Sequence, residues 1–194
     1  MSELKFGDLQ SGLIRTAIHL ALEHWSNAST LTFREEYFTD DVNIRISFQR
    51  GNHGDRYAFD GRGLVLAHAF FPTHKSDLHL DVDEEWNFDF LLRVMIHELG
   101  HSLGLSHSGV REATMYPWYK EDGPIGLDVD DINGIQYIYG LKSKWAKIIP
   151  YTPTTTRPKV HKRVWFNLKN LNISSINIVN SNIKKVMVIN NHKS

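Results

Sequence analysis

Cysteine is absent from all 194 residues of this sequence, and several kinds of chemistry are excluded with it. A disulfide framework, a thiol nucleophile and a zinc site with cysteine ligands all need that residue. Long hydrophobic runs are missing too, since no apolar stretch approaches the roughly eighteen residues that a membrane span requires. The first ten residues lack the charged-then-apolar order of a signal peptide. Hydrophobic residues nevertheless make up 41% of the chain, which is enough to bury the core of a folded domain.

Net charge is absent as well, because 22 Lys and Arg balance 22 Asp and Glu, and this balance does not favour nucleic-acid binding. The zero conceals an asymmetry. Residues 1–140 contain all 22 acids and 11 bases, whereas residues 141–194 contain 11 bases and no acid. The stretch 151–158 is rich in Pro and Thr, as extended linkers are. We therefore expect a domain over residues 1–140, followed over residues 141–194 by a Pro/Thr linker and a basic, Asn-rich tail with strand-forming residues but little to pack against.

Hydrophobic periodicity predicts three helices in this domain, at about residues 11–26, 88–103 and 128–139. Strand patterns occur at residues 42–48, 64–70 and 78–80, between loops rich in Gly, Asp and Pro. Strands come before the last two helices without βαβ alternation, and this order predicts an α+β fold.

The second predicted helix carries a histidine motif. His97 and His101 are four residues apart, so both imidazoles lie on one helical face and can bind one metal ion. Gly104 lets the chain leave the helix and turn back, which brings His107 as a third ligand. Three neutral imidazoles and one open position are typical of a catalytic zinc site, and Glu98 stands where a carboxylate can take a proton from a metal-bound water. A helix with ordinary surface histidines is the alternative, but so many matching positions seldom coincide.

A methionine follows the histidine motif at a short distance in the sequence. A lone Met is more often a filler of the core. Met115, however, comes eight residues after His107, within the sequence Ala-Thr-Met-Tyr-Pro. The extended histidine motif combined with a later Met-turn resembles the metzincin signature.

A second group of possible ligands precedes the motif. His53, His68, His79 and Asp55 together would make a closed tetrahedral shell, as in structural zinc sites. Carboxylates near flexible glycines, as in residues 60–63 and 81–84, suit a calcium ion. Taken alone, the scattered histidines are more often ordinary surface or core residues, and the acidic turn is more often simply solvated.

Three segments together resemble the catalytic domain of the matrix metalloproteinases, the matrixins: residues 51–70, residues 79–86 and the histidine motif followed by Ser108. The resemblance starts at about Asp8 and ends at Gly140. It implies a metzincin-like fold with a twisted, mostly parallel sheet and three helices. The first strand of that family lies inside the sheet and precedes the first helix, and we expect this chain to lack it.

The resemblance also assigns roles to single residues. It implies that Glu98 is the general base and that Met115 forms the Met-turn. It gives the catalytic zinc the ligands His97, His101 and His107, and the structural zinc the ligands His53, Asp55, His68 and His79. At least one calcium ion would be held by Asp60, Gly61, Gly63, Val65, Asp81 and Glu84. An extended substrate would bind along the edge strand at Ala67, with Pro117 and Tyr119 lining the pocket after the scissile bond.

The function implied is that of a zinc-dependent endopeptidase, in which a zinc-bound water activated by Glu98 hydrolyses peptide bonds of extracellular or matrix proteins. The alternative is a truncated chain of the same family that binds zinc without turnover. We expect a monomer that acts on an extended peptide or protein, with no nucleic-acid partner and no membrane span. A weak contact of the basic tail with polyanions is a further expectation. An extracellular location follows from the resemblance alone.

Overall fold

The computed structural model describes residues 11–36, 38–39, 41–72, 76–141 and 163–169. Its helices are α1 (Ser11–Ala28), α2 (Phe88–Ser102) and α3 (Val129–Tyr139). Its strands are β1 (Thr32–Glu35), β2 (Ile44–Gln49), β3 (Ala67–Ala69), β4 (Ser76–Asp81) and β5 (Arg163–Lys169). The strands form one sheet in the order β1-β5-β2-β4-β3, parallel throughout except for the β3–β4 pair. None of the described helices is long and apolar enough to span a membrane.

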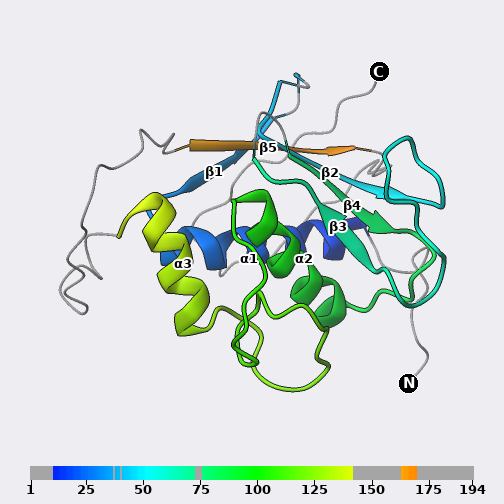
Figure 1. Cartoon of the computed structure of the whole chain (residues 1–194). Coiled ribbons are helices and arrows are strands. Elements are labelled where there is room, and N and C mark those ends of the chain that lie inside the picture. Colours follow the sequence, from blue (N-terminus) through cyan, green and yellow to red (C-terminus); the bar gives the residue numbers. More distant parts are fainter. Residues whose placement is uncertain (1–10, 37, 40, 73–75, 142–162, 170–194) are drawn as a thin grey trace.

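The helices cover one face of the sheet, with α1 and α2 beneath it and α3 at one end (Figure 1). The apolar positions of α1 recur at helical spacing, and Ile18, Leu22 and Trp25 are fully buried as a result. On α2 the same spacing buries Met95 and Leu99. The indole Nε1 of Trp25 donates to the carbonyl of Ile96 at 3.0 Å, so α1 is fixed against the helix that carries the histidine motif.

The predicted α+β class, with three helices and a mostly parallel sheet, is confirmed. The strand expected at residues 64–70 is shorter than predicted, because Leu64 has a φ of 59°, in the left-handed region that breaks a strand. β1 was not predicted; it has only four residues, and its alternation contains a single apolar side chain, Phe33.

β5 comes from the segment that composition assigned to the tail. It lies inside the sheet between β1 and β2, where Figure 1 shows it in orange among blue strands. This interior position is the one that the family resemblance gives to a strand ahead of the first helix. The boundary between domain and tail at residue 140 stays a prediction, but Arg163–Lys169, which lie beyond it, contribute a strand to the sheet of the domain.

Glu35 of β1 is a buried carboxyl beneath this part of the sheet. Its side chain is fully buried, and within the described part of the chain neither carboxylate oxygen has a hydrogen-bond partner. Arg15 Nη2 and His19 Nε2 lie 3.9 and 3.8 Å from Oε2. Burial raises the pKa of Glu35 to about 9, against the opposing effect of the Arg15 charge. The folded protein therefore holds this proton more tightly than the unfolded chain does.

We expect Glu35→Gln to stabilise the protein at alkaline pH. The contribution of Glu35 is fully present below its ordinary pKa of 4.5 and is lost as pH rises through about 9, because ionisation then requires a buried charge. A neutral amide avoids that cost, so urea denaturation at pH 8 should show a gain on the order of 2 kcal/mol over the parent, with little difference near pH 5. The neighbouring Glu36→Gln is the control. A loss of stability in Glu35→Gln at pH 8 would show instead that the charged pair with Arg15 is stabilising.

Candidate metal centres and cleft

The end of α2 and the turn after it bring three histidines together. His97 and His101 lie one helical turn apart on α2. Gly104 adopts a φ of 99°, and the N–H of Leu105 donates back to the carbonyl of Gly100 at 2.9 Å, so the chain reverses there. His107 then meets the other two rings. The ligand atoms of the three histidines lie within 4.8 Å of one another, and the Nε2 atoms of His101 and His107 are 3.1 Å apart.

The hydrogen bonds of these rings leave their Nε2 atoms available to a metal. His97 Nδ1 lies 2.7 Å from the carbonyl of Thr114, and His101 Nδ1 lies 2.7 Å from that of Leu105, so each Nδ1 carries the proton. Burial lowers the pKa of His97 to about 4 and also lowers that of His101, which keeps both rings neutral. Tetrahedral zinc with bonds of about 2.0–2.1 Å separates its nitrogen ligands by about 3.3 Å. The three-histidine cluster therefore fits a zinc ion.

Met115 supports the helix turn between the first two histidines. Its side chain is 1% exposed and lies so close to Gly100 that a Cβ there would clash with the sulfur. The same Cβ would come within 2.9 Å of Trp25 Cζ2. Glycine at position 100 thus allows the loop that carries Met115 to pack directly under α2.

Asp131 was not predicted, yet it holds this loop in place. Its carboxylate accepts from the backbone N–H of Thr114 at 2.7 Å and of Met115 at 3.0 Å. Asp131 is 1% exposed and also closes a capping box with Asp128 at the start of α3. Since the Thr114 carbonyl orients His97, Asp131 is a positioning residue for the cluster. The capping pattern at residues 128–131 was the available signal, but it gave no indication of the distant partners.

Glu98 lies beside the histidines and is 7% exposed. Its Oε2 has no hydrogen-bond partner among the described residues. Burial raises the pKa of Glu98 to about 8. A buried carboxyl with an unused oxygen on the wall of a cleft is suited to receive and release a proton.

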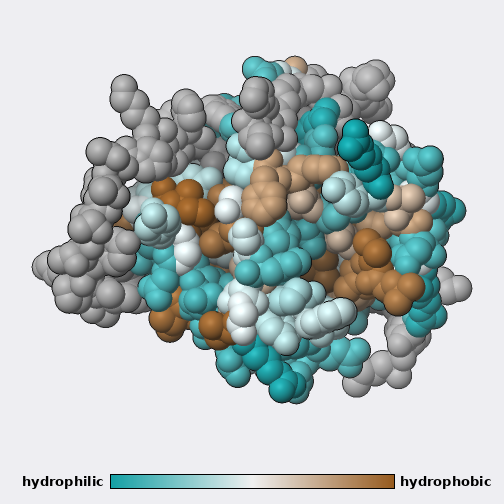
Figure 2. Space-filling view, in the orientation of Figure 1, coloured by the Kyte–Doolittle hydropathy of each residue, from teal (hydrophilic) through white to brown (hydrophobic). Residues whose placement is uncertain are grey.

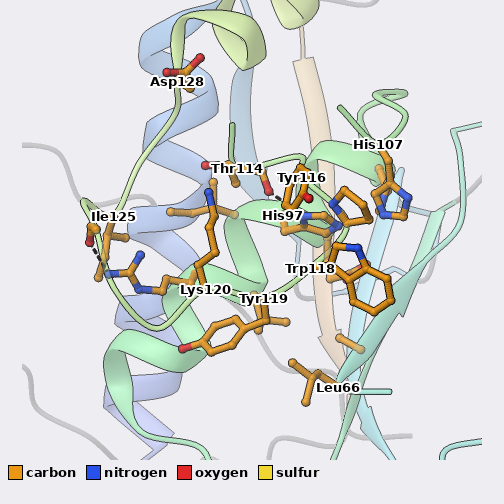
Figure 3. A pocket seen from close by; sticks show the side chains of 18 of the residues that line it. Leu66, His97, His107, Thr114, Tyr116, Trp118, Tyr119, Lys120, Ile125 and Asp128 are labelled. Atoms are coloured by element: carbon orange, nitrogen blue, oxygen red, sulfur yellow. Dashed lines mark hydrogen bonds between the residues drawn. The ribbon is translucent and has the colours of Figure 1, made fainter. Parts of the chain in front are cut away.

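A cleft runs past the histidines and Glu98. One wall contains β3, which begins at Ala67 and pairs with β4 alone among the described strands, and the residues just before it, including Leu66. The other wall contains the loop with Pro117, Trp118 and Tyr119 (Figure 3). All three residues that the resemblance assigned to substrate binding therefore line one cleft with the histidine motif. Apolar surface on this side of the molecule is broken up by hydrophilic side chains (Figure 2).

Arg93 is a cleft residue that sequence reasoning missed. It precedes His97 by four residues and so lies on the same face of α2. Its guanidinium donates to the carbonyl of Gly123 at 2.6 Å and to that of Pro124 at 3.2 Å. Burial raises the pKa of the lining residue Tyr119, and the nearby Arg93 charge opposes that effect. Arg93 thus joins the helix to the loop that closes one end of the cleft. Its spacing from His97 was the only available signal.

The second histidine group also assembles. Asp55 Oδ2 lies 2.9 Å from a ring nitrogen of each of His53, His68 and His79. The ring nitrogens of His53 and His68 lie 3.1 and 3.2 Å from Nδ1 of His79. Burial by itself raises the pKa of Asp55, but hydrogen bonds from the Tyr57 N–H and from the histidines hold it below its usual range. Three nitrogens and one oxygen about 3 Å apart form a closed shell that fits zinc.

The surroundings of this shell fix one of its rings. His53 Nδ1 lies 2.8 Å from the carbonyl of Gly51, which directs Nε2 towards the shared point. The buried Phe59 stacks on the His53 ring at a centroid distance of 4.9 Å. These contacts orient a ligand and exclude water, as expected around a structural metal site.

Five of the six proposed calcium ligands are connected by hydrogen bonds or by the effects of their charges. Glu84 accepts from the N–H of Gly63 at 2.6 Å, and Asp60 accepts from that of Val65 at 3.3 Å. Burial raises the pKa of Glu84, and the charges of Asp81 and Asp60 raise it further. Asp81 is fully buried, and its Oδ2 has no hydrogen-bond partner among the described residues. A bound cation would relieve this repulsion, so calcium remains a prediction that the arrangement favours.

Known proteins resemble this chain over the region that contains both clusters. A family model described as Matrixin matches residues 3–140. Matrix metalloproteinase-2 of Drosophila melanogaster is 48% identical over 156 residues, covering 74% of this chain and 20% of the relative. The hatching enzyme of Paracentrotus lividus is 45% identical, covering 78% and 26%. Interstitial collagenase of Equus caballus is 46% identical, covering 79% and 34%.

The chain spans about a fifth to a third of the length of these relatives. The matching region contains both histidine clusters, the Met115 loop and all three helices. The zinc dependence of the family agrees with the two ligand sets. This chain belongs to the matrixin family.

Proposed function

We propose that this chain is a zinc-dependent endopeptidase that cleaves extended segments of extracellular or matrix proteins. The observation that supports this most strongly is the convergence of three imidazoles and Glu98 in one cleft, beside a strand edge that no other described strand pairs with. His97, His101 and His107 would hold the catalytic zinc, which supplies Lewis-acid polarisation of the scissile carbonyl and a water of lowered pKa.

Glu98 carries out the proton transfers. Its free Oε2 takes a proton from the attacking water, and the same carboxyl then passes that proton to the leaving amine. The surrounding burial excludes bulk water from this exchange. Thr114 and Leu105 keep His97 and His101 in the tautomer that directs Nε2 to the metal, and Asp131 holds Thr114 in place.

The substrate binds as an added strand along β3. The cleft-facing edge of β3 offers backbone groups near Ala67 to an extended peptide, antiparallel or parallel to the sheet. The side chain that follows the scissile bond enters the pocket between Pro117 and Tyr119, which Arg93 closes. A structural zinc at the Asp55 cluster and a calcium ion at residues 60–65 and 81–84 would hold the loop that precedes β3 and the turn that follows β4.

Cleavage of a quenched collagen-like peptide by the purified chain, with zinc and calcium present, tests this function. We expect cleavage that a chelator abolishes and that added zinc restores. Zinc binding without any cleavage would contradict the proposal and would favour a chain of this family that binds metal without turnover. We place the activity outside the cell and expect a monomer, while a weak polyanion contact of the basic tail remains a separate prediction.

Arg93→Ala should widen the specificity of the pocket. Removing the guanidinium enlarges the pocket and removes the two hydrogen bonds to loop carbonyls. We therefore expect the ratio of kcat/KM for a peptide with a long aromatic side chain after the scissile bond to kcat/KM for one with leucine there to rise about tenfold. Arg93→Lys, which retains a long cationic side chain, is the matched control. Unchanged relative kcat/KM values in Arg93→Ala would show that this residue does not limit the pocket.

A further inference from the structure

The interior of the sheet contains a strand that the chain contributes from beyond its last helix. β5 pairs in parallel with β1 from Thr32↔Arg163 to Glu35↔Phe166. On its other side it pairs in parallel with β2 from Ile44↔Phe166 to Ser47↔Lys169. Among the described strands, β1 has no other partner, so it joins the sheet only through β5.

This strand is one step removed from a metal cluster. The β2 residues that pair with β5 pair on their other side with β4, and Ser47 is opposite both Lys169 and His79. His79 is one of the four ligands around Asp55. The ladder therefore runs without a break from β5 through β2 to a ligand of the proposed structural zinc.

Without an occupant, the position between β1 and β2 would expose two strand edges and part of the core. Backbone groups on both edges would lose their partners. Phe33 of β1 and Ile44 and Ile46 of β2 are buried core residues that belong to the two separated strands. The empty position would thus be an apolar slot with two unpaired edges, which is a binding site for a strand.

Two observations make the segment of the same chain the natural occupant. First, the carbonyl of Tyr139 accepts from Thr30 Oγ1 at 2.6 Å, so the end of α3 lies in space beside the start of β1. The first residue of β5, Arg163, is also at that end of β1, opposite Thr32. Residues 142–162 number 21 in the sequence, and a chain of that length can reach far beyond one end of a strand. Second, residues 1–140 have twice as many acids as bases, whereas residues 141–194 have bases and no acid, so the two attract each other.

We propose that the slot between β1 and β2 is a strand-accepting site, that Arg163–Lys169 of the same chain occupies it, and that the Asp55 metal cluster depends on this occupation. The tail is then a structural part of the catalytic domain rather than an appendage. This inference rests on the structural zinc proposed above for the Asp55 cluster but not on peptide cleavage, because it concerns only the sheet and that cluster.

Paired cysteines test the register, since the chain contains no cysteine of its own. Arg34→Cys combined with Trp165→Cys places two thiols at directly registered positions of β1 and β5. Neighbouring strands are about 4.8 Å apart, within the Cα separation that a disulfide accepts. Arg34→Cys with Phe166→Cys is the matched control, one residue out of register and directed to the opposite face.

We expect the registered pair to form a disulfide within one chain under mild oxidation, and the control pair to remain reduced. Disulfide-linked dimers would overturn the proposal by showing that a second copy donates the strand. Absence of any cross-link, or equal cross-linking of both pairs, would also overturn it.

A proline in β5 tests the dependence. Phe166 is registered with Glu35 on one side and with Ile44 on the other, so Phe166→Pro disturbs both pairings. In the full-length Phe166→Pro variant, we expect the backbone amides of residues 44–47 to exchange about a hundredfold faster than in the parent. We also expect the variant to lose zinc from the Asp55 cluster at a lower chelator concentration than the parent. Ile176→Pro, in the tail outside β5, is the control. Exchange and zinc retention as in the parent would refute the proposal, and the cysteine pairs decide it should Phe166→Pro fail to fold.

Discussion

Glu98→Ala should lower kcat for peptide cleavage by about 10²–10⁴-fold while the protein remains folded and keeps its zinc. The proposed zinc ligands are His97, His101 and His107, so the loss of Glu98 leaves the ligand set intact. What disappears is the carboxyl that accepts the proton of the attacking water. Removing a buried carboxyl with an unpartnered oxygen also relieves a cost, so the melting temperature should not fall.

The measurement is kcat and KM on the quenched peptide, with zinc content determined on the same preparation. Glu112→Ala is a matched control, because Glu112 is an exposed carboxylate that lines the same cleft. A Glu98→Ala enzyme with near-normal turnover would exclude Glu98 as the base. Loss of zinc together with activity would give Glu98 a role in holding the metal site instead.

Asp55→Ala should cause the largest loss of stability among the single changes considered. Asp55 contacts all three histidines of its cluster, so its removal opens the closed shell. Zinc present at a thousandfold excess over its dissociation constant stabilises a fold by about 4 kcal/mol. For a protein of this size, losing that contribution lowers the melting temperature by roughly 8–16 °C.

Thermal melts with and without added zinc, together with the zinc content per chain, measure this effect. Asp122→Ala removes an exposed carboxylate outside both clusters and serves as the control. We expect the parent to bind one zinc more than Asp55→Ala, and a chelator to reduce the parent to the stability of the variant. Equal zinc content and equal melting temperatures would exclude a structural metal at this cluster.

The parts of this protein that could be predicted from the sequence are those with a local signal. α2 and its histidines follow from helical spacing, and the turn after them follows from Gly104. The role of Asp131 was not predicted, because its carboxylate binds the backbone N–H groups of Thr114 and Met115, which are seventeen and sixteen residues earlier in the chain. Leu64 was expected in a strand because its side chain is apolar, whereas its backbone is left-handed and its side chain 93% exposed.

The place of β5 could not be predicted for a similar reason. Strand propensity was visible in the Asn-rich tail from Asn167 onward, whereas β5 begins at Arg163. The partners of a parallel strand lie far away in the chain, and the sequence of the strand itself does not identify them. Charge asymmetry suggested two separate units, and composition alone does not distinguish a solvated tail from a strand that enters an acidic domain. Residue chemistry raised the second histidine cluster only as a possibility, and the resemblance was needed to favour it, because its ligands are spread over 27 positions from His53 to His79.

The interior place of β5 also determines when the sheet can be completed during synthesis. Arg163 pairs with Thr32, 131 positions earlier in the chain, so this pairing closes a very long loop. A nascent chain that has reached residue 141 already contains every histidine of both clusters, but the strand between β1 and β2 has not yet been made. At about 5–20 residues per second, ribosomes need a few more seconds to add residues 142–169. During that interval all the metal ligands exist on a sheet that is still split, so the ligand sets are translated before the scaffold that holds them can close.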